Sequence, residues 1–150
     1  MQGKSRTTYH KRGALINKPL IQIDYAYLRS STDGKATPVL TFIETITGLA
    51  GAIITDIKGP TRYQVTTLKR FILEHGFQDT TMQSDGEPAL GELMTTVCSE
   101  LTQLSIRQSP PYAHRSQGSV ERYHQTLFNQ LRTTKLAFCD KYKIDPTTVP

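Results

Sequence analysis

The hydrophobic pattern of this chain begins with short runs of β-branched and aromatic residues, which are separated by turn-forming residues. Such runs predict β-strands, because their side chains fit the faces of a pleated, partly buried sheet. The runs are residues 20–28, 39–46, 50–56, 80–84 and 104–108. The first three follow one another on short turns, which predicts an antiparallel meander.

Apolar residues spaced three and four apart predict helices in the rest of the chain. The first helix begins after an N-cap at Thr61, runs to about Glu74 and has Gly76 at its C-terminal cap. A second helix covers residues 87–101 and a third covers residues 119–142.

The third helix carries an apolar stripe, which we expect to be buried against the rest of the domain. Glu121 lies at the margin of this stripe, about 100° from its centre. The stripe consists of Val120, Leu127, Leu131 and Phe138.

The element order is three strands, helix, strand, helix, strand, loop and helix. This order predicts an α/β protein with a mixed five-stranded sheet, strands one to three antiparallel, flanked by helices. We expect residues 19–150 to form one domain. Residues 1–18 lack apolar periodicity and are predicted to be a basic flexible arm or linker.

Basic residues gather towards both ends of the chain. Residues 1–18 hold five Lys or Arg and no acid, and residues 107–143 hold seven against two acids, whereas residues 19–106 hold ten acids against six bases. Basic segments attract phosphate backbones because binding releases counterions. A solvated tail and a solvated helix face would give the same pattern, so charge alone leaves nucleic-acid binding open.

Composition excludes two other classes of protein. No apolar run approaches the roughly 20 residues that a membrane helix needs. Cys98 and Cys139 lack zinc-finger spacing, and we expect two reduced, partly buried thiols in an intracellular protein.

Three carboxylates are candidate metal ligands, and each also has a structural explanation. Asp24 interrupts an apolar strand, where an ion pair could compensate its burial. Asp85 follows the fourth strand, where ligand-binding residues gather, but it could cap the next helix. Glu121 lies in the first turn of the last helix, where it could offset the helix dipole. Three such oxygen ligands suit Mg²⁺ or Mn²⁺, and two such ions about 4 Å apart promote phosphodiester chemistry.

The spacing of these carboxylates resembles the catalytic core of retroviral and LTR-retrotransposon integrases. Thirty-five residues separate Asp85 from Glu121. Tyr112 and the sequence Ser116-Gln117-Gly118 precede Glu121 in the register of that family's catalytic loop. Gly86 departs from the family, in which Asn commonly follows the second Asp.

The resemblance implies an RNase H-like fold and a metal-binding catalytic triad of Asp24, Asp85 and Glu121. It implies a DDE-type polynucleotidyl transferase from a retroelement Pol polyprotein, acting with two Mg²⁺ or Mn²⁺ ions. Its partners would be the element's DNA ends, target DNA and further copies of itself, with no membrane. It would act on nuclear DNA, within a virus-like particle or the nucleus. We expect this chain to be the isolated core of a longer polyprotein.

The resemblance also suggests DNA contacts, chiefly through phosphates. Gly118 would give the loop its mobility. A lysine common in the family is replaced by Phe128. The candidate contacts are Tyr112, Arg115, Gln117, His124, Gln125, Arg132 and Lys135, with Arg107 and Arg122 as further phosphate ligands.

Two alternatives remain open. One is a DDE transposase or a nuclease of the same fold. The other is an inactive transposon remnant that binds nucleic acid or oligomerises without catalysis.

Overall fold

A computed structural model describes residues 18–29, 34–77, 79–109 and 117–149. Its five strands form one mixed sheet in the order β3-β2-β1-β4-β5. The first three strands are antiparallel, and β4 and β5 run parallel to β1. This confirms the predicted architecture. The strands are β1 (Leu20–Arg29), β2 (Ala36–Glu44), β3 (Ala50–Ile54), β4 (Thr80–Ser84) and β5 (Leu104–Gln108).

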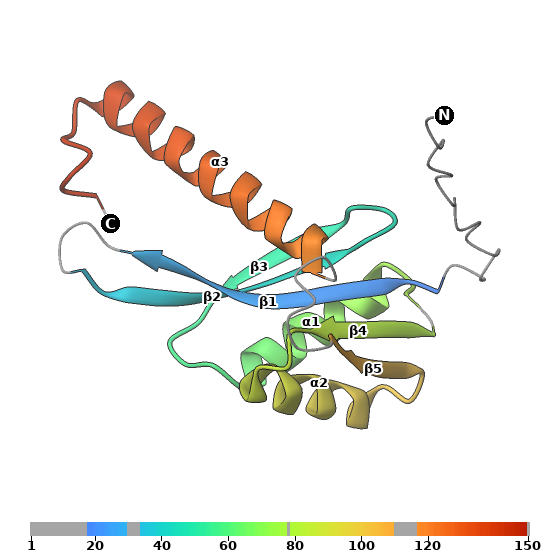
Figure 1. Ribbon diagram of the computed structural model, residues 1–150. Helices are drawn as coiled ribbons and strands as arrows, with labels where there is room; N and C mark the ends of the chain where they lie inside the picture. The colour runs from blue at the N-terminus through green and yellow to red at the C-terminus, as the bar shows by residue number, and fades with distance from the viewer. Residues whose placement is uncertain (1–17, 30–33, 78, 110–116, 150) are drawn as a thin grey trace, which may run out of the picture.

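The helices lie on opposite faces of the sheet (Figure 1). Helices α1 (Arg62–Glu74) and α2 (Pro88–Glu100) cover one face, and α3 (Gly118–Tyr142) crosses the other. The apolar core lies between the sheet and the first two helices, and includes Ile21, Ile23, Leu40, Phe42, Met82, Leu68, Leu90 and Leu93. In the described part of the chain, no helix is both long enough and apolar enough to cross a membrane.

Most element boundaries agree with the hydrophobic pattern. The Thr61 side chain caps α1 by accepting a hydrogen bond from the Gln64 amide. Gly76 lies one residue beyond the C-cap residue His75, at a φ of 65° that a glycine adopts without strain. The second strand begins at Ala36, three residues earlier than the pattern indicated, and it ends at Glu44, two residues earlier, because the chain turns directly after Glu44.

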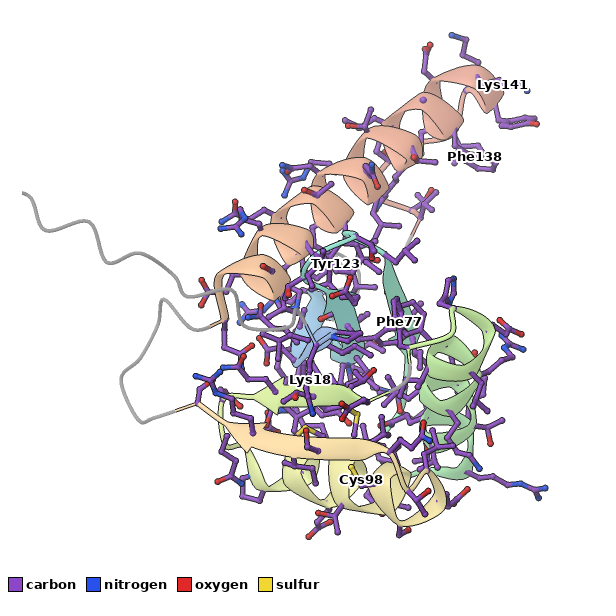
Figure 2. All side chains as sticks on the ribbon, turned by 90° about the vertical axis from the view of Figure 1, so that its right-hand side faces the viewer. Lys18, Phe77, Cys98, Tyr123, Phe138 and Lys141 are labelled. Carbon is purple, nitrogen blue, oxygen red and sulfur yellow. The ribbon has the colours of Figure 1, made fainter. Side chains whose placement is uncertain are left out.

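The predicted burial of the α3 stripe is wrong for its C-terminal half. Val120 is fully buried, but Leu131 and Phe138 are 44% and 47% exposed. Figure 2 shows the reason: Tyr123 lies where α3 meets the sheet, whereas Phe138 and Lys141 lie on the part of the helix that extends past it. Helical periodicity identifies an apolar face, but it does not show whether another element covers that face.

A buried carboxylate closes the turn between β2 and β3. Glu44 is 1% exposed, and its two oxygens accept hydrogen bonds from the Ile46 amide at 3.0 Å and from the Thr47 amide and hydroxyl at 2.7 Å. Burial by itself raises the pKa of Glu44, but these hydrogen bonds outweigh burial and lower the pKa overall. The carboxylate therefore stabilises the meander in its ionised form.

We predict that Glu44→Gln lowers the free energy of unfolding by about 1–3 kcal/mol near neutral pH, because the amide cannot accept all of these bonds. Since the pKa of Glu44 is lowered on folding, its contribution is complete above its ordinary pKa and is lost as the pH falls through the folded value. Urea unfolding near pH 7 and near pH 3 should therefore show a gap between the free energies of unfolding of wild type and variant that is smaller at the lower pH. The exposed Glu74→Gln is the control, and an equal gap at both pH values would contradict the prediction.

Candidate metal centre

The parallel pairing of β1 with β4 brings two of the candidate carboxylates to one part of the sheet. Gln22 of β1 pairs with Gln83 of β4. Because side chains alternate along a strand, Asp24 lies on the same face as Gln22, and Asp85 follows directly after the last residue of β4. Thr41 lies opposite Asp24 in β2 and forms a hydrogen bond with His124 of α3, so this is the face that α3 covers.

Asp24 is held by its surroundings on β1. Its Oδ1 accepts a hydrogen bond from the Tyr25 amide at 2.7 Å, and its side chain is 26% exposed. Thr41 donates from its hydroxyl to the Asp24 carbonyl at 3.0 Å. The Nδ1 of His124 lies 4.0 Å from the Asp24 Oδ2. No lysine or arginine pairs with Asp24 in the described part of the chain, so the ion-pair explanation finds no such partner there.

The pKa of Asp24 is shifted by its burial and by the negative charges around it. The pKa of Asp24 is raised to about 6, chiefly by burial and further by the charges of Asp85, Glu87 and Glu121, which together outweigh the Tyr25 hydrogen bond. The other two candidate carboxylates, Asp85 and Glu121, therefore both act electrostatically on Asp24. A raised carboxylate pKa in such a cluster is typical of a functional site.

Asp85 lies in the turn between β4 and α2. Its Oδ1 accepts a hydrogen bond from the Glu87 amide at 3.0 Å, across Gly86, whose φ is 91°. The N-cap position of α2 belongs to Glu87, so Asp85 does not fill the capping role that its sequence position also allowed. Its side chain remains exposed for a ligand.

Glu121 lies in the first turn of α3 and is exposed. Its negative charge acts on both Asp24 and His124. Burial lowers the pKa of His124, and the charge of Glu121 opposes this effect. His124 is therefore mainly neutral near pH 7 and leaves the charge of the carboxylates uncompensated.

Two charged residues at the edge of this cluster were missed by the sequence analysis. Lys58 pairs with Glu87 at 2.6 Å and lies 5.1 Å and 5.0 Å from the ring centres of Tyr25 and Tyr27. Burial acts to lower the pKa of Lys58, but the hydrogen bond to Glu87 prevails and the pKa rises to about 12. In the sequence, Glu87 was marked only as a second acid two positions after Asp85. Its pairing with Lys58 gave no local signal, because the two residues are 29 positions apart.

The chemistry of the three carboxylates suits a divalent cation. Among the described residues, no three His, Cys, Asp or Glu side chains stand close enough together to hold one ion as they are placed here. Carboxylate oxygens are nevertheless the ligands that Mg²⁺ prefers, and it binds through only one or two of them. A divalent cation would also relieve the repulsion that raises the pKa of Asp24.

The candidate DNA contacts near the start of α3 are placed as follows. Tyr112 and Arg115 lie outside the described residues. Gln117 is 6% exposed and donates to the Ser109 hydroxyl at 3.3 Å, so contact with DNA would require it to leave this position. Gly118 is the first residue of α3, and its part in the mobility of the preceding loop stays a prediction.

The remaining candidates lie along α3 and β5. His124 is turned towards Asp24 and Thr41, and its side chain is 16% exposed. Lys135 is half-buried and donates to the Val149 carbonyl at 2.5 Å. The exposed candidates are Arg107, Arg122, Gln125 and Arg132.

This sheet topology, with α3 across the face that carries Asp24, defines a protein with the RNase H-like fold. In particular, the chain has the fold of retroviral integrase catalytic cores. It is similar to the HTLV-2 integrase catalytic core domain in complex with magnesium (trimeric form), at a TM-score of 0.56 and 15% identity over 80% of this chain and 73% of that one. It is also similar to the catalytic core domain of BIV integrase, at a TM-score of 0.50 and 21% identity over 87% of this chain and 77% of that one.

A further similarity is to a chain in the structure of the simian T-cell lymphotropic virus intasome in complex with PP2A regulatory subunit B56 gamma. There the TM-score is 0.61 at 18% identity, over 83% of this chain and 42% of that chain. This chain thus spans less than half of that chain. No protein-family model and no curated protein matches the sequence. At these identities the similarities show the fold alone.

We predict that Asp24→Asn stabilises the metal-free protein at about pH 8, by at most about 3 kcal/mol. Because the folded pKa of about 6 lies above the ordinary value of 3.8, ionisation of Asp24 destabilises the fold. This penalty is absent below the ordinary pKa and complete above the folded one. Thermal unfolding in EDTA should therefore show a higher Tm for the variant at about pH 8 and little difference near pH 4.

Added Mg²⁺ should raise the Tm of the wild type more than that of Asp24→Asn, because the variant lacks one ligand. The exposed Asp140→Asn is the matched control, and its Tm and metal response should follow the wild type. A metal-free Asp24→Asn that is less stable than wild type at about pH 8 would contradict the electrostatic argument.

Proposed function

We propose that this chain is the catalytic core of an integrase-type polynucleotidyl transferase, with Asp24, Asp85 and Glu121 as its metal-binding catalytic residues. The observation that carries the proposal is the half-buried carboxylate of Asp24, whose pKa is raised by burial and by three neighbouring acids. Asp24 lies in the middle of β1, on the face covered by α3, in a fold shared with integrase cores. The magnesium in the HTLV-2 structures supports the choice of ion.

The reaction proposed is the exchange of one phosphodiester bond for another. Two bound Mg²⁺ or Mn²⁺ ions would supply the positive charge that activates an attacking oxygen and stabilises a leaving oxygen. Attack by water would trim an element DNA end, and attack by its 3′-hydroxyl would join that end to target DNA. The protein's own part is to hold three carboxylates in place: Asp24 through Tyr25 and Thr41, and Asp85 through Glu87.

The proposed DNA partner would meet the exposed face of α3. Gln125 and Arg132 are exposed on this helix, and Lys141 and Lys143 extend its positive charge. Tyr112, Arg115 and Gln117 remain proposed contacts from the loop before it. The dimeric and trimeric forms of the HTLV-2 core support a homo-oligomer. Within this proposal, residues 19–150 form the catalytic core of a Pol polyprotein, residues 1–18 form a basic arm, and the site of action is nuclear DNA.

We predict that Glu121→Gln lowers DNA strand transfer in Mg²⁺ by about a hundredfold or more, because one metal ligand loses its charge. The measurement is the joining of a labelled oligonucleotide end to a target duplex, with Glu74→Gln on α1 as the control. Equal joining by the wild type and Glu121→Gln would end the catalytic proposal. Cleavage by the wild type without any joining would instead favour a nuclease of the same fold.

We predict that Arg132→Ala weakens DNA binding by a similar factor for unrelated sequences, because phosphate contacts carry no base information. The slope of log affinity against log salt should fall by about one for each phosphate that the variant no longer neutralises. Fluorescence anisotropy over a salt series measures both effects. Arg70→Ala, an exposed arginine on α1, should leave affinity and slope unchanged, and an equal weakening in the two variants would refute the proposed surface.

A further inference from the structure

A buried glutamine joins the strand of Asp24 to the helix of Glu121. Gln22 is 5% exposed, and its Oε1 accepts hydrogen bonds from the amides of Ser119 and Val120, both at 3.1 Å. The first amides of a helix have no partner within the helix and usually bond to the N-cap side chain. The N-cap residue of α3, Gln117, makes no such bond. A side chain from β1 therefore fills the capping role for α3.

The position of this cap relates it to the metal ligands. Gln22 lies two residues before Asp24 and on the same face of β1, about 7 Å away along the strand. Ser119 and Val120 are the two residues that directly precede Glu121. We propose that Gln22 is a positioning residue that sets the distance between the Asp24 and Glu121 carboxylates. Its consequence for catalysis rests on the proposed function.

A second set of buried polar contacts supports the same junction from β4 and β5. Gln83, the register partner of Gln22, donates to the Ser109 hydroxyl at 2.8 Å, and Gln117 donates to that hydroxyl at 3.3 Å. Gln83 and Ser109 are 2% and 8% exposed. Because β4 leads directly to Asp85, these contacts connect the start of α3 to the strand of the second aspartate as well.

The polar character of this junction argues for positioning. Burying an amide destabilises a protein unless it is hydrogen-bonded, and an apolar side chain would fill the same space without that penalty. Hydrogen bonds, unlike apolar contacts, fix both distance and direction. Sliding or rotating the first turn of α3 would break both bonds to Gln22, so the helix has one preferred placement over Asp24. Metal ligands require such control, because removing an outer support costs about 10- to 100-fold in metal affinity or activity.

The test compares two buried glutamines that lie on opposite faces of the sheet. Gln64 is 0% exposed and bonds to Tyr25, Thr55 and Ile57 on the side away from α3. Gln22→Met and Gln64→Met each replace a buried amide side chain with an apolar one of similar size, so both should lower the free energy of unfolding. Only Gln22→Met should speed amide exchange at Ser119 and Val120 and weaken Mn²⁺ affinity, by about 10- to 100-fold.

A conservative variant separates positioning from simple packing. Gln22→Glu retains an oxygen acceptor and should restore the exchange protection of both amides to near the wild-type level. Unchanged exchange at Ser119 and Val120 in Gln22→Met would overturn the inference, as would an equal weakening of Mn²⁺ affinity in Gln22→Met and Gln64→Met. If the wild type binds no Mn²⁺, the proposed function fails, and amide exchange alone decides whether Gln22 places the helix.

Discussion

The parallel pairing of β1 with β4 is the constraint on which the candidate site depends. It aligns Gln22 with Gln83, so that Asp24, two residues further along β1, lies near the end of β4, which Asp85 directly follows. A shift of one residue in this register would turn one aspartate towards the apolar core. Buried Ile21 and Met82, paired on the opposite face, make such a shift costly, because it would also expose them. The apolar core thus fixes the placement of the polar site.

The two faces of the sheet have different tasks. The face towards α1 and α2 is apolar and closely covered, and it supplies the stability of the domain. The face towards α3 holds glutamines, threonine and aspartate, and α3 covers it only near Tyr123 before extending away from it (Figure 2). This division lets a stable half of the molecule support a face whose carboxylates repel one another, a strain that is typical of functional sites.

Electrostatic repulsion at the site is only partly offset by the protein itself. Lys58 neutralises Glu87 at the edge of the cluster, whereas the pKa of His124 is lowered and this side chain adds little positive charge beside Asp24. The remaining negative charge is what a divalent cation would compensate. The buried hydrogen bonds of Gln22 act on a different quantity, the distance between strand and helix. Charge and spacing are therefore controlled by separate residues, which allows each to be altered without the other.

The sequence by itself determined the order of the elements, because alternation and helical spacing are local properties. The bounds of β4 and β5 follow directly from runs of five residues each. It also marked Asp24, since a charged residue in an apolar strand is conspicuous without any structure. Together with the 35-residue gap and the loop sequence before Glu121, this gave the resemblance to integrase cores that implied the RNase H-like fold and the three carboxylates.

Only the tertiary structure decided which residues support the three carboxylates. Gln22 and Ser119 are 97 positions apart, and Lys58 and Glu87 are 29 apart, so no local pattern relates them. The exposure of the C-terminal half of the α3 stripe could not be predicted from the sequence either. Periodicity shows which residues share a face of the helix, but not whether the sheet extends beneath that face. Local sequence determines which face of each element is apolar, whereas contacts between distant elements determine which polar groups meet, and the candidate site consists of such contacts.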